Sequence, residues 1–403
     1  MDFNLTDEQK HIREEIRRFA ENELAPDAAE RDAQEKFPHR QVKELGRLGY
    51  LGINTPAEYG GQGADMVSYA IVIEELSRVD ASTGAIVSVN NSLVCYGLEL
   101  FGSDYLKQTH LIPLAKGELL GAYCLSEPGS GSDASNMQTT VRREGDSYVI
   151  NGTKNFITNG VNADRFIVFA TIDKAAGHRG VCAFLVEKNS PGFSVGKKEK
   201  KLGIRSSDTA MLNFDDVKVP AENLLGQERK GFNIAMKILD CGRIGIAAQA
   251  LGIAQSALDA ALKYAKERVQ FDKPIAEFQA IQFMLADMAT HIDAARLLVY
   301  RAAATKDEGR DYATAAAQAK LYASQVAVDC AVKAVQIYGG AGYLKDYPVE
   351  RIMRDARITE IYEGTSEIQK LVIARSLLKK KFALKRDFII LDRFSSVRII
   401  IVL

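Results

Sequence analysis

The chain has 403 residues, of which 47% are hydrophobic, and its 52 lysines and arginines balance 52 aspartates and glutamates. A chain of this length and apolar content can bury a large core, so two or three domains are expected and disorder is not. Because the net charge is zero, no global field favours nucleic acid or an anionic membrane as a partner. Any anionic ligand must therefore be held by local chemistry.

The cysteines and histidines give no pattern of a disulfide framework or a metal site. The five cysteines are odd in number, widely spaced and without a CxxC pair, and the five histidines form no HExxH motif or His/Cys cluster. The N-terminus lacks the basic start and apolar block of a signal peptide, and no run reaches the roughly 18 apolar residues of a membrane span. We therefore expect a soluble, cytoplasmic protein with no metal and no membrane span. The cysteines are Cys95, Cys124, Cys182, Cys241 and Cys330.

Residues 1–117 are patterned as helices. Thr6 followed by Gln9 is a capping-box signature, in which each side chain satisfies a backbone N–H group of the other residue at a helix start. Apolar residues then recur at the spacing of one helical face, at Ile12, Ile16 and Phe19. This section is predicted to be an N-terminal helical domain.

Residues 118–225 change to short strand-like runs separated by glycine, proline and asparagine. In "DSYVINGTKNFITNG" the Asn151-Gly152 pair lies between β-rich arms. It predicts a hairpin, because both central residues of a type I′ turn need a positive φ. We expect a central β domain over this section.

Helical periodicity returns over residues 226–380. One apolar stripe, with further apolar positions beside it, predicts a helix buried on several sides. Helices, then strands, then helices segregate the two kinds of element, which favours an α+β fold over a parallel α/β fold. Residues 381–403 fit neither half, and their apolar end is β-prone and too short to span a membrane, so a non-native extension and a functional tail both stay open. The stripe consists of Ala247, Leu251, Ala254, Leu258 and Leu262.

The stretch "ITEIYEGTSEIQK", residues 358–370, places three carboxylates around a glycine. The preceding "RIMRDARITEIY" is typical of a helix that ends near Gly364. Ser366 with Gln369 forms a second capping-box signature, which predicts the start of a new helix. Glu363 is therefore expected at a junction between two helices.

The three acids of this stretch differ in position. Glu360 lies in a charged helix and is expected to be solvated or ion-paired, whereas Glu367 lies in the first turn of a helix, where the macrodipole stabilises its anion. Glu363 lies at a helix C-terminus, where the dipole disfavours a carboxylate and burial would raise its pKa, as a base that removes a carbon-bound proton needs. Acids at helix ends are common, so the residues alone leave a structural role open.

Two loops of the β section carry groups that fit a planar or phosphorylated ligand. In "YCLSEPGSGSDASN" Gly129, Gly131 and Ala134 satisfy GxGxxA, but the segment runs into strands rather than a helix, which argues against a dinucleotide-binding turn. Its small hydroxyl residues can contact a flavin or a phosphate, or form a plain surface turn. In "NFITNG" Phe156 offers a flat face and Thr158 a hydroxyl, although strand aromatics are usually core.

Two helical segments complete the candidate sites. "LDCGRIGIA" places Asp240 and Arg243 one turn apart, either as ligand contacts or as a simple i,i+3 ion pair. "QIYGGAGY" places Gln336 before a Gly339-Gly340 break, where either the backbone approaches a ligand closely or a helix simply ends.

Together these segments resemble the acyl-CoA dehydrogenase family over nearly the whole chain. "YCLSEPGSGSD", "FITNG", "ERVQFDKPIAEFQAIQ", "QIYGGAGY" and "MRDARITEIYEGTSEIQ" occur in the family's order and spacing. "SVNNSL" and "LDCGRIGIAAQALGIAQ" are most similar to the short-chain members, the butyryl-CoA dehydrogenases. The resemblance implies an N-terminal helical domain, a central β domain and a C-terminal four-helix bundle, assembled as a homotetramer with one FAD per subunit.

The resemblance also assigns binding roles. The residues that match the first flavin loop and the pair beside the flavin ring are Tyr123, Leu125, Ser126, Gly131, Ser132, Phe156 and Thr158. Those that match contacts to FAD bound in a neighbouring subunit are Arg268, Gln279, Gln336, Gly339 and Gly340, and further FAD contacts are Thr365 and Glu367. Those that match acyl-CoA contacts are Ser132, Asp240, Arg243 and Gly364. Many relatives have Trp at the position of Phe156, so weaker stacking on the flavin is expected here.

Glu363 matches the family's catalytic base. Some relatives, including isovaleryl-CoA dehydrogenases, place the base on the helix that begins near Asp240, where this chain has Gly242, and glycine cannot act as a base. The implied reaction is the FAD-dependent α,β-dehydrogenation of a short-chain acyl-CoA, such as butyryl-CoA to crotonyl-CoA in fatty acid metabolism. Glu363 would take the α-proton, flavin N5 the β-hydride, and electron-transferring flavoprotein the electrons. The alternatives are the same chemistry on a branched, medium-chain or glutaryl thioester, and a non-catalytic helical scaffold.

Overall fold

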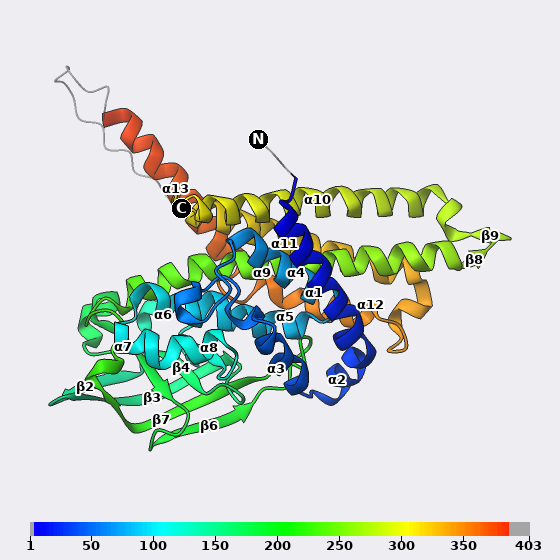
Figure 1. Cartoon of the computed structure of the whole chain (residues 1–403). Helices are drawn as coiled ribbons and strands as arrows, with labels where there is room; N and C mark the ends of the chain where they lie inside the picture. The colour runs from blue at the N-terminus through cyan, green and yellow to red at the C-terminus, as the bar shows by residue number, and fades with distance from the viewer. Residues whose placement is uncertain (1–3, 387–403) are drawn as a thin grey trace.

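The computed structural model describes residues 4–386, which form helices, then a sheet, then helices along the chain (Figure 1). Three long helices lie along the length of the molecule, with the sheet beneath one end of them. A short two-stranded hairpin, β8 (Val269–Gln270) and β9 (Lys273–Pro274), projects from the other end (Figure 1). The predicted α+β order of elements is confirmed. The long helices are α9 (Gly231–Glu267), α10 (Gln279–Asp307) and α11 (Ala313–Tyr338).

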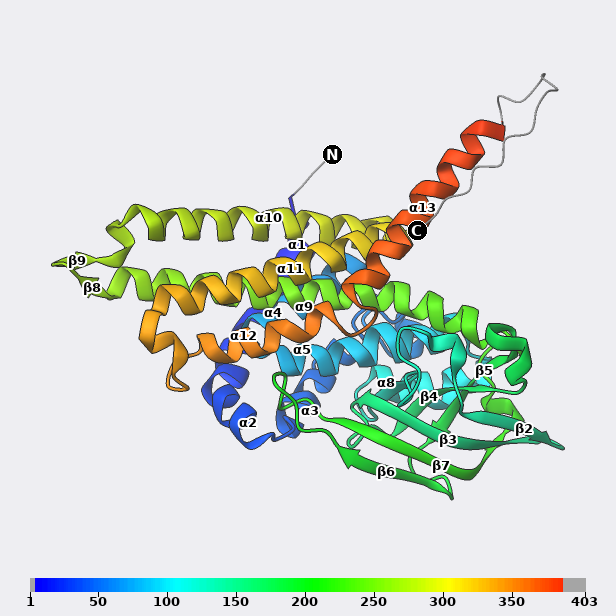
Figure 2. The same ribbon diagram turned by 180° about the vertical axis from the view of Figure 1, so that it is seen from behind.

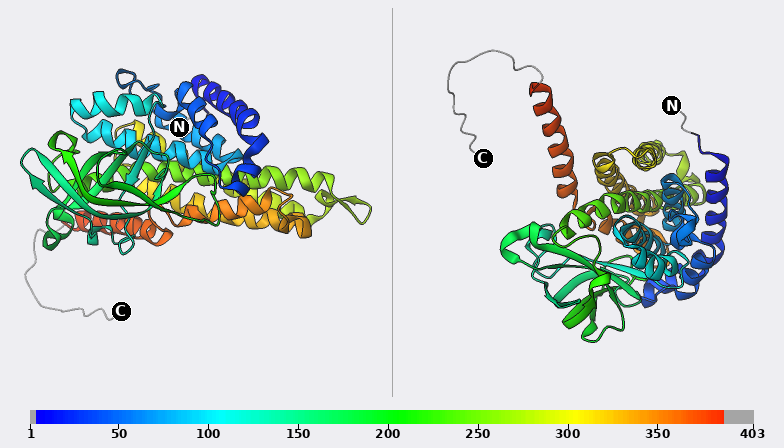
Figure 3. Two further views of the ribbon diagram at one scale, coloured as in Figure 1. Left: turned by 90° about the horizontal axis from the view of Figure 1, so that it is seen from below. Right: turned by 60° about the vertical axis from the view of Figure 1, so that its left-hand side comes forward.

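The N-terminal helices pack against α9 and against one another, as two further views show (Figure 3). The predicted capping box is confirmed: the Gln9 N–H donates to Thr6 Oγ1 and the Thr6 N–H donates to Gln9 Oε1. Ile16 and Phe19 are buried on the core face of the first helix. The helices are α1 (Asp7–Phe19), α2 (Ala28–Gln34), α3 (His39–Arg47), α4 (Met66–Val79), α5 (Ala81–Ser88), α6 (Tyr96–Phe101), α7 (Asp104–Leu106) and α8 (Ile112–Ala115), with a π-helical segment, η5 (Val89–Cys95), between α5 and α6.

The central section forms a seven-stranded sheet in the order β1-β4-β2-β3-β7-β6, with β5 paired to β4. Most pairs are antiparallel, and β1 and β4 run parallel. Apolar side chains on both sides of the sheet are buried, one set against helices and one within the β section. The strands are β1 (Gly121–Cys124), β2 (Thr140–Glu144), β3 (Ser147–Thr158), β4 (Arg165–Thr171), β5 (Val181–Glu187), β6 (Phe193–Lys198) and β7 (Thr209–Pro220).

The hairpin predicted at Asn151-Gly152 is wrong, because β3 runs straight through this pair. The chain turns between β2 and β3 instead, with Gly145 at a φ of 58°. Gly152 has a φ of 145° at a bulge in the pairing with β7. A Cβ atom at position 152 would lie 2.6 Å from Thr139 Oγ1, so glycine is needed there for close approach rather than for a turn.

Helix α9 is the central core helix of the molecule. In the predicted stripe Ala247, Leu251 and Ala254 are fully buried, whereas Leu258 is half-buried and Leu262, nearer the β8–β9 end, is 39% exposed. Among the residues described, α9 is the one helix with the length and apolar composition of a membrane span, and most of that window is buried within the protein. Burial on several sides is thus confirmed for its first half.

The chain returns from the far end through α12 (Val349–Arg357) and a short 3₁₀ turn, η12 (Ile358–Glu360), to α13 (Ser366–Arg386). The view from behind shows α12 running back toward the start of α13 (Figure 2). Of the atypical section 381–403, the first six residues continue α13, and the rest lies outside the described residues.

Candidate active site

Glu363 lies in the turn between η12 and α13, as predicted. Its φ is 51° and that of Gly364 is 98°, so two successive residues have left-handed backbone conformations. For a residue other than glycine this conformation costs about 1 kcal/mol, so the surrounding structure must hold Glu363 there.

The second capping box is wrong by one residue. Thr365 is the cap: its Oγ1 accepts a hydrogen bond from the Ile368 N–H at 3.4 Å, and Ser366 is already the first residue of α13. The Gln369 side chain reaches past the cap, and its Nε2 donates to the Gly364 carbonyl at 2.8 Å and to the Glu363 carbonyl at 3.3 Å. Gln369 therefore holds the turn that carries Glu363.

The Glu363 carboxyl group faces Gly242 of α9 and is unpaired at one oxygen within the described part of the chain. Its Oε2 atom is buried and has no hydrogen-bond partner among the described residues. Burial raises the pKa of Glu363 to about 7, against the opposing effect of the Lys320 and Arg243 charges. A Cβ atom at Gly242 would lie 2.2 Å from this oxygen, so positions 242 and 363 face the same point. Glycine at 242 is what leaves room for the carboxyl group.

The other two acids of the stretch have the ordinary roles predicted for them. Glu360 forms an ion pair with Arg357, one turn earlier on the same surface. Glu367 is exposed in the first turn of α13, where hydrogen bonds from its own N–H group and from Thr365 lower its pKa. Position and burial together single out Glu363.

Asp240 and Arg243 line the same region from α9. Arg243 Nη1 donates to Asp240 Oδ1 at 2.5 Å, so the ion pair is present. Arg243 is 5% exposed, and its Nε atom is buried with no hydrogen-bond partner among the described residues. Tyr123 of β1 is joined to the same helix, because its hydroxyl donates to the Ala235 carbonyl at 3.2 Å. The site therefore contains both the Asp240–Arg243 ion pair and an unpartnered donor, the Arg243 Nε–H group.

The loop after β1 is supported by a buried ion pair that the sequence gave no reason to single out. Lys154 Nζ donates to Glu127 Oε1 at 2.7 Å and to the Leu125 carbonyl at 3.1 Å, and both side chains are almost fully buried. The Asn155 N–H donates to the Ser126 carbonyl at 2.8 Å, which joins this loop to β3. The segments that carry residues 123–126 and 155–158 are therefore held together.

This pair of segments presents an open surface that fits a flat ligand. Phe156 has a φ of 58° and its side chain is 63% exposed, contrary to the usual core position of a strand aromatic. Nothing lies within 4 Å of a Cβ position at Gly129 or Gly131, and Ser132 is exposed beside them. Thr158, half-buried, follows on β3. An exposed ring beside backbone with no side chains in the way is suited to a planar heterocycle.

A third group of predicted residues is not near Glu363 in this chain. Its members lie at the far end of the long helices, next to the β8–β9 hairpin, and all are exposed (Figure 1). The stacking of Tyr264 near the end of α9 on Tyr338 at the end of α11, with ring centroids 4.0 Å apart, brings the two helix ends together. The group consists of Arg268, Gln279, Gln336, Gly339 and Gly340.

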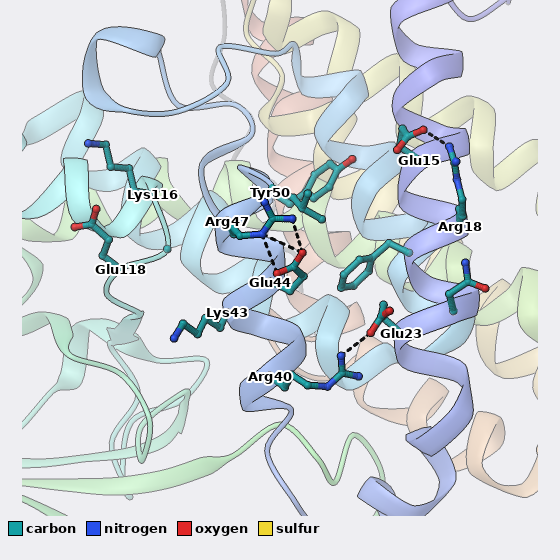
Figure 4. Close-up of a pocket in the computed structure, with 14 residues that line it drawn as sticks. Glu15, Arg18, Glu23, Arg40, Lys43, Glu44, Arg47, Tyr50, Lys116 and Glu118 are labelled. Carbon is teal, nitrogen blue, oxygen red and sulfur yellow. Dashed lines mark hydrogen bonds and ion pairs between the residues drawn. The ribbon is translucent and has the colours of Figure 1, made fainter.

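A groove with a volume of ≈ 790 Å³ lies between α1 and α3, away from all of these residues (Figure 4). Its walls carry charges of both signs, joined in part as ion pairs: Arg40 with Glu23 at 2.6 Å and Arg47 with Glu44 at 2.7 Å. No predicted site residue lines it, so it is separate from the candidate active site.

Lys320 is a neighbour of Glu363 that the sequence did not reveal. It is fully buried on α11, and its Nζ donates to the Gly364 carbonyl at 2.7 Å. A lysine within "AQAKLYAS" has the appearance of a surface residue of an alanine-rich helix, so no local signal could have found it.

Comparison with known proteins agrees with this arrangement. Three family models match in order: the N-terminal domain of acyl-CoA dehydrogenase over residues 6–118, its middle domain over 122–217 and its C-terminal domain over 229–378. The short-chain specific acyl-CoA dehydrogenase of Clostridium acetobutylicum is 55% identical over 94% of this chain and 100% of that protein.

Two solved structures are similarly close. Butyryl-CoA dehydrogenase from Megasphaera elsdenii has a TM-score of 0.93 and 50% identity, over 94% of this chain and 100% of that one. A chain from a structure of the electron transferring flavoprotein of Acidaminococcus fermentans has a TM-score of 0.93 and 52% identity, over the same shares. The chain therefore belongs to the acyl-CoA dehydrogenase family, whose cofactor is FAD.

Proposed function

We propose that this chain desaturates short-chain acyl-CoA thioesters, such as butyryl-CoA, between the α and β carbons. The observation that carries the proposal is the Glu363 Oε2 atom, which is buried, has no hydrogen-bond partner among the described residues and faces Gly242. The short-chain specificity is supported by the similarity to the Clostridium acetobutylicum and Megasphaera elsdenii proteins.

Glu363 takes the α-proton of the thioester at its free oxygen. A base with a pKa of about 7 is largely ionised above neutral pH and still binds the proton it removes, which is the compromise that general base catalysis requires. The open segments around Phe156 fit the flavin ring, and FAD, when bound there, supplies the acceptor for the β-hydride. The acyl chain must lie between that acceptor and Glu363.

The same turn stabilises the negative charge that grows on the thioester oxygen as the α-proton leaves. The Glu363 backbone N–H makes no hydrogen bond within the described part of the chain, so it is free to donate to this oxygen. Arg243, with its unpartnered Nε, and Lys320 place positive charge on the same side. These donors are positioned before the substrate arrives, which is the condition for effective electrostatic stabilisation.

The complete cofactor site requires a second subunit, and we propose a homotetramer. The residues matched to a neighbouring subunit's FAD lie at the β8–β9 end of the long helices, whereas Phe156 lies on β3 of the sheet, beneath the other end. That end also carries large exposed apolar side chains, with Phe271 87% exposed and Tyr343 86% exposed, which is typical of an interaction surface. Electron-transferring flavoprotein is the proposed acceptor of the electrons, supported by the similarity to the Acidaminococcus fermentans chain.

The test is an anaerobic titration of the purified protein with acyl-CoA thioesters. The protein should be yellow, butyryl-CoA should bleach the flavin absorbance, and octanoyl-CoA, isovaleryl-CoA and glutaryl-CoA should do so poorly. A colourless protein that does not bind added FAD would contradict the reaction. Bleaching by the longer, branched or dicarboxylic thioesters alone would contradict the short-chain assignment. Reoxidation by air as fast as by electron-transferring flavoprotein would instead indicate an oxidase.

A further inference from the structure

Lys320 is a buried cation beside the turn that carries Glu363. It is fully buried on α11 and takes part in no ion pair within the described residues, and its one hydrogen bond there goes to the Gly364 carbonyl at 2.7 Å. A buried ammonium group is costly unless it is paired, and here burial lowers the pKa of Lys320 to about 8. The fold keeps the charge at this point without a carboxylate in direct contact.

The carbonyl that Lys320 contacts belongs to the turn that carries the base. Glu363 and Gly364 both have a positive φ, and only the second of them is a glycine. Two buried side chains from different helices donate to carbonyls of this turn: Lys320 from α11 and Gln369 from α13. Hydrogen bonds from both sides restrict the conformation of this strained turn, so the Glu363 carboxyl group is held in one orientation.

Lys320 is also the strongest positive influence on the Glu363 carboxyl group. Its charge opposes the rise that burial causes in the Glu363 pKa, ahead of the charge on Arg243, which is already paired with Asp240. Glu360 is paired with Arg357, and Glu367 is exposed. Burial keeps the other titratable groups facing the site neutral by raising their pKa values: Tyr69 of α4, Tyr123 of β1, Cys241 of α9 and the adjacent Tyr362.

We propose that Lys320 is a positioning residue for the base: its buried ammonium group holds the Gly364 carbonyl, fixes the left-handed turn and keeps the Glu363 carboxylate directed and ionised at the reaction site. This role rests on the assignment of Glu363 as the base in the proposed function. The ammonium group does not need to touch the substrate, because it acts through the turn and through its charge. Gln369 shares the first part of this role but, as a neutral amide, not the second.

The test compares Lys320→Met, which removes charge and donor, with Lys320→Arg, which keeps both. Lys333→Met is the matched control, since Lys333 lies on the same helix, partly exposed and paired with Asp329 at 2.9 Å. For each holoenzyme we would measure FAD content, kcat and KM for butyryl-CoA, and the pH profile of kcat/KM, whose rising limb reports the base in the free enzyme.

For Lys320→Met we expect full FAD content, a fall in kcat between about tenfold and about a hundredfold and a change in KM below about threefold, because the base is misdirected rather than removed. The rising limb should move up from about pH 7 by about one unit, since the cation that favours the ionised form is gone. Lys320→Arg should leave the rising limb of the pH profile in place and recover part of kcat. Lys333→Met should change neither kcat nor the pH profile.

The proposal would be overturned if Lys320→Met kept the wild-type kcat and the wild-type pH profile of kcat/KM. It would also be overturned if Lys320→Met and Lys320→Arg lost kcat equally and the rising limb of the pH profile did not move in either. If Lys320→Met does not fold, Gln369→Leu tests whether side-chain contacts to the Glu363-Gly364 turn direct the base. In this variant kcat should fall while the rising limb of the pH profile stays in place, and an unchanged kcat would overturn this part of the proposal. Glu363→Gln is measured alongside. If it keeps a tenth of the activity, the base assignment fails; if it is inactive while Lys320→Met behaves as wild type, only the positioning role fails.

Discussion

The turn at Glu363-Gly364 and the tip of the β8–β9 hairpin contain the same local backbone feature and use it differently. At the tip, Phe271 and Asp272 have φ values of 52° and 64°, and they form the two-residue loop between β8 and β9. At the active site, Glu363 and Gly364 have φ values of 51° and 98°. Both places hold a non-glycine residue in the left-handed region, where strain is often kept for a function.

What differs is the source of the support. The active-site turn is gripped by Lys320 and Gln369 from within the same chain. The hairpin tip is held by strand pairing and by an edge contact between the Phe271 and Phe278 rings, and it leaves Phe271 87% exposed. One turn is thus complete within a single chain, whereas the other presents an apolar side chain outward. Side chains of the same chain hold the turn at Glu363, whereas the hairpin offers an apolar side chain to the subunit interface proposed above.

The largest effect is expected from removing the carboxyl group of Glu363 in the first turn. Glu363→Gln keeps the shape of the side chain but cannot accept the α-proton, so desaturation of butyryl-CoA should fall by about 10⁴-fold. FAD content and oligomeric state should stay as in the wild type. The measurement is anaerobic flavin bleaching, and a rate of even a tenth of wild type would rule out this base.

The same substitution should stabilise the protein at high pH. The pKa of Glu363 is raised from 4.5 to about 7 in the folded state, so the ionised group destabilises the fold, and this loss develops as pH rises from about 4.5 through about 7. Glu363→Gln should therefore raise the free energy of unfolding by up to about 3 kcal/mol at pH 9. It should have little effect at pH 4. Urea unfolding at pH 4 and pH 9 checks this prediction. An equal change in the free energy of unfolding at the two pH values would show that ionisation of the carboxyl group does not destabilise the fold.

Gly242→Ala tests the space that the base occupies. The added Cβ atom would lie 2.2 Å from Glu363 Oε2 and 2.7 Å from Leu93 Cδ2, so the carboxyl group must move. A displacement of this kind should lower kcat by about a hundredfold. FAD content should be retained, because position 242 faces the carboxyl group rather than the open surface at Phe156. A normal kcat would mean that the base works from another rotamer.

Phe271→Asp tests the second turn. If Phe271 lies in the proposed subunit interface, a charge there should weaken assembly by about 2 kcal/mol or more, with loss of FAD as the subunits separate. Sedimentation velocity over a range of concentrations, with absorbance at the flavin band, reports both. Leu100→Asp is the control, since Leu100 is 44% exposed on α6, away from the hairpin. If the wild type, Phe271→Asp and Leu100→Asp assemble equally, the hairpin is not part of the subunit interface.

Predictions from local rules succeeded where a short segment settles its own conformation. Thr6 and Gln9 form their capping box because both partners lie within one turn. The Asn151-Gly152 prediction failed because the close approach of Thr139, a contact outside that dipeptide, decides the conformation of Gly152. A two-residue loop with both φ values positive occurs instead at Phe271-Asp272, where neither residue is a glycine or an asparagine.

The sequence alone determined the order of helices and strands, the junction at which Glu363 lies and the ordinary roles of Glu360 and Glu367. These depend on periodicity, caps and helix ends, all of which are written in neighbouring residues. Only the tertiary structure decided that Glu363 is buried opposite Gly242, that Gln369 and not a Ser366 cap holds its turn, and that Lys320 lies beneath it. Burial and charge at this site come from segments far apart in the chain, and no local pattern records which of them meet.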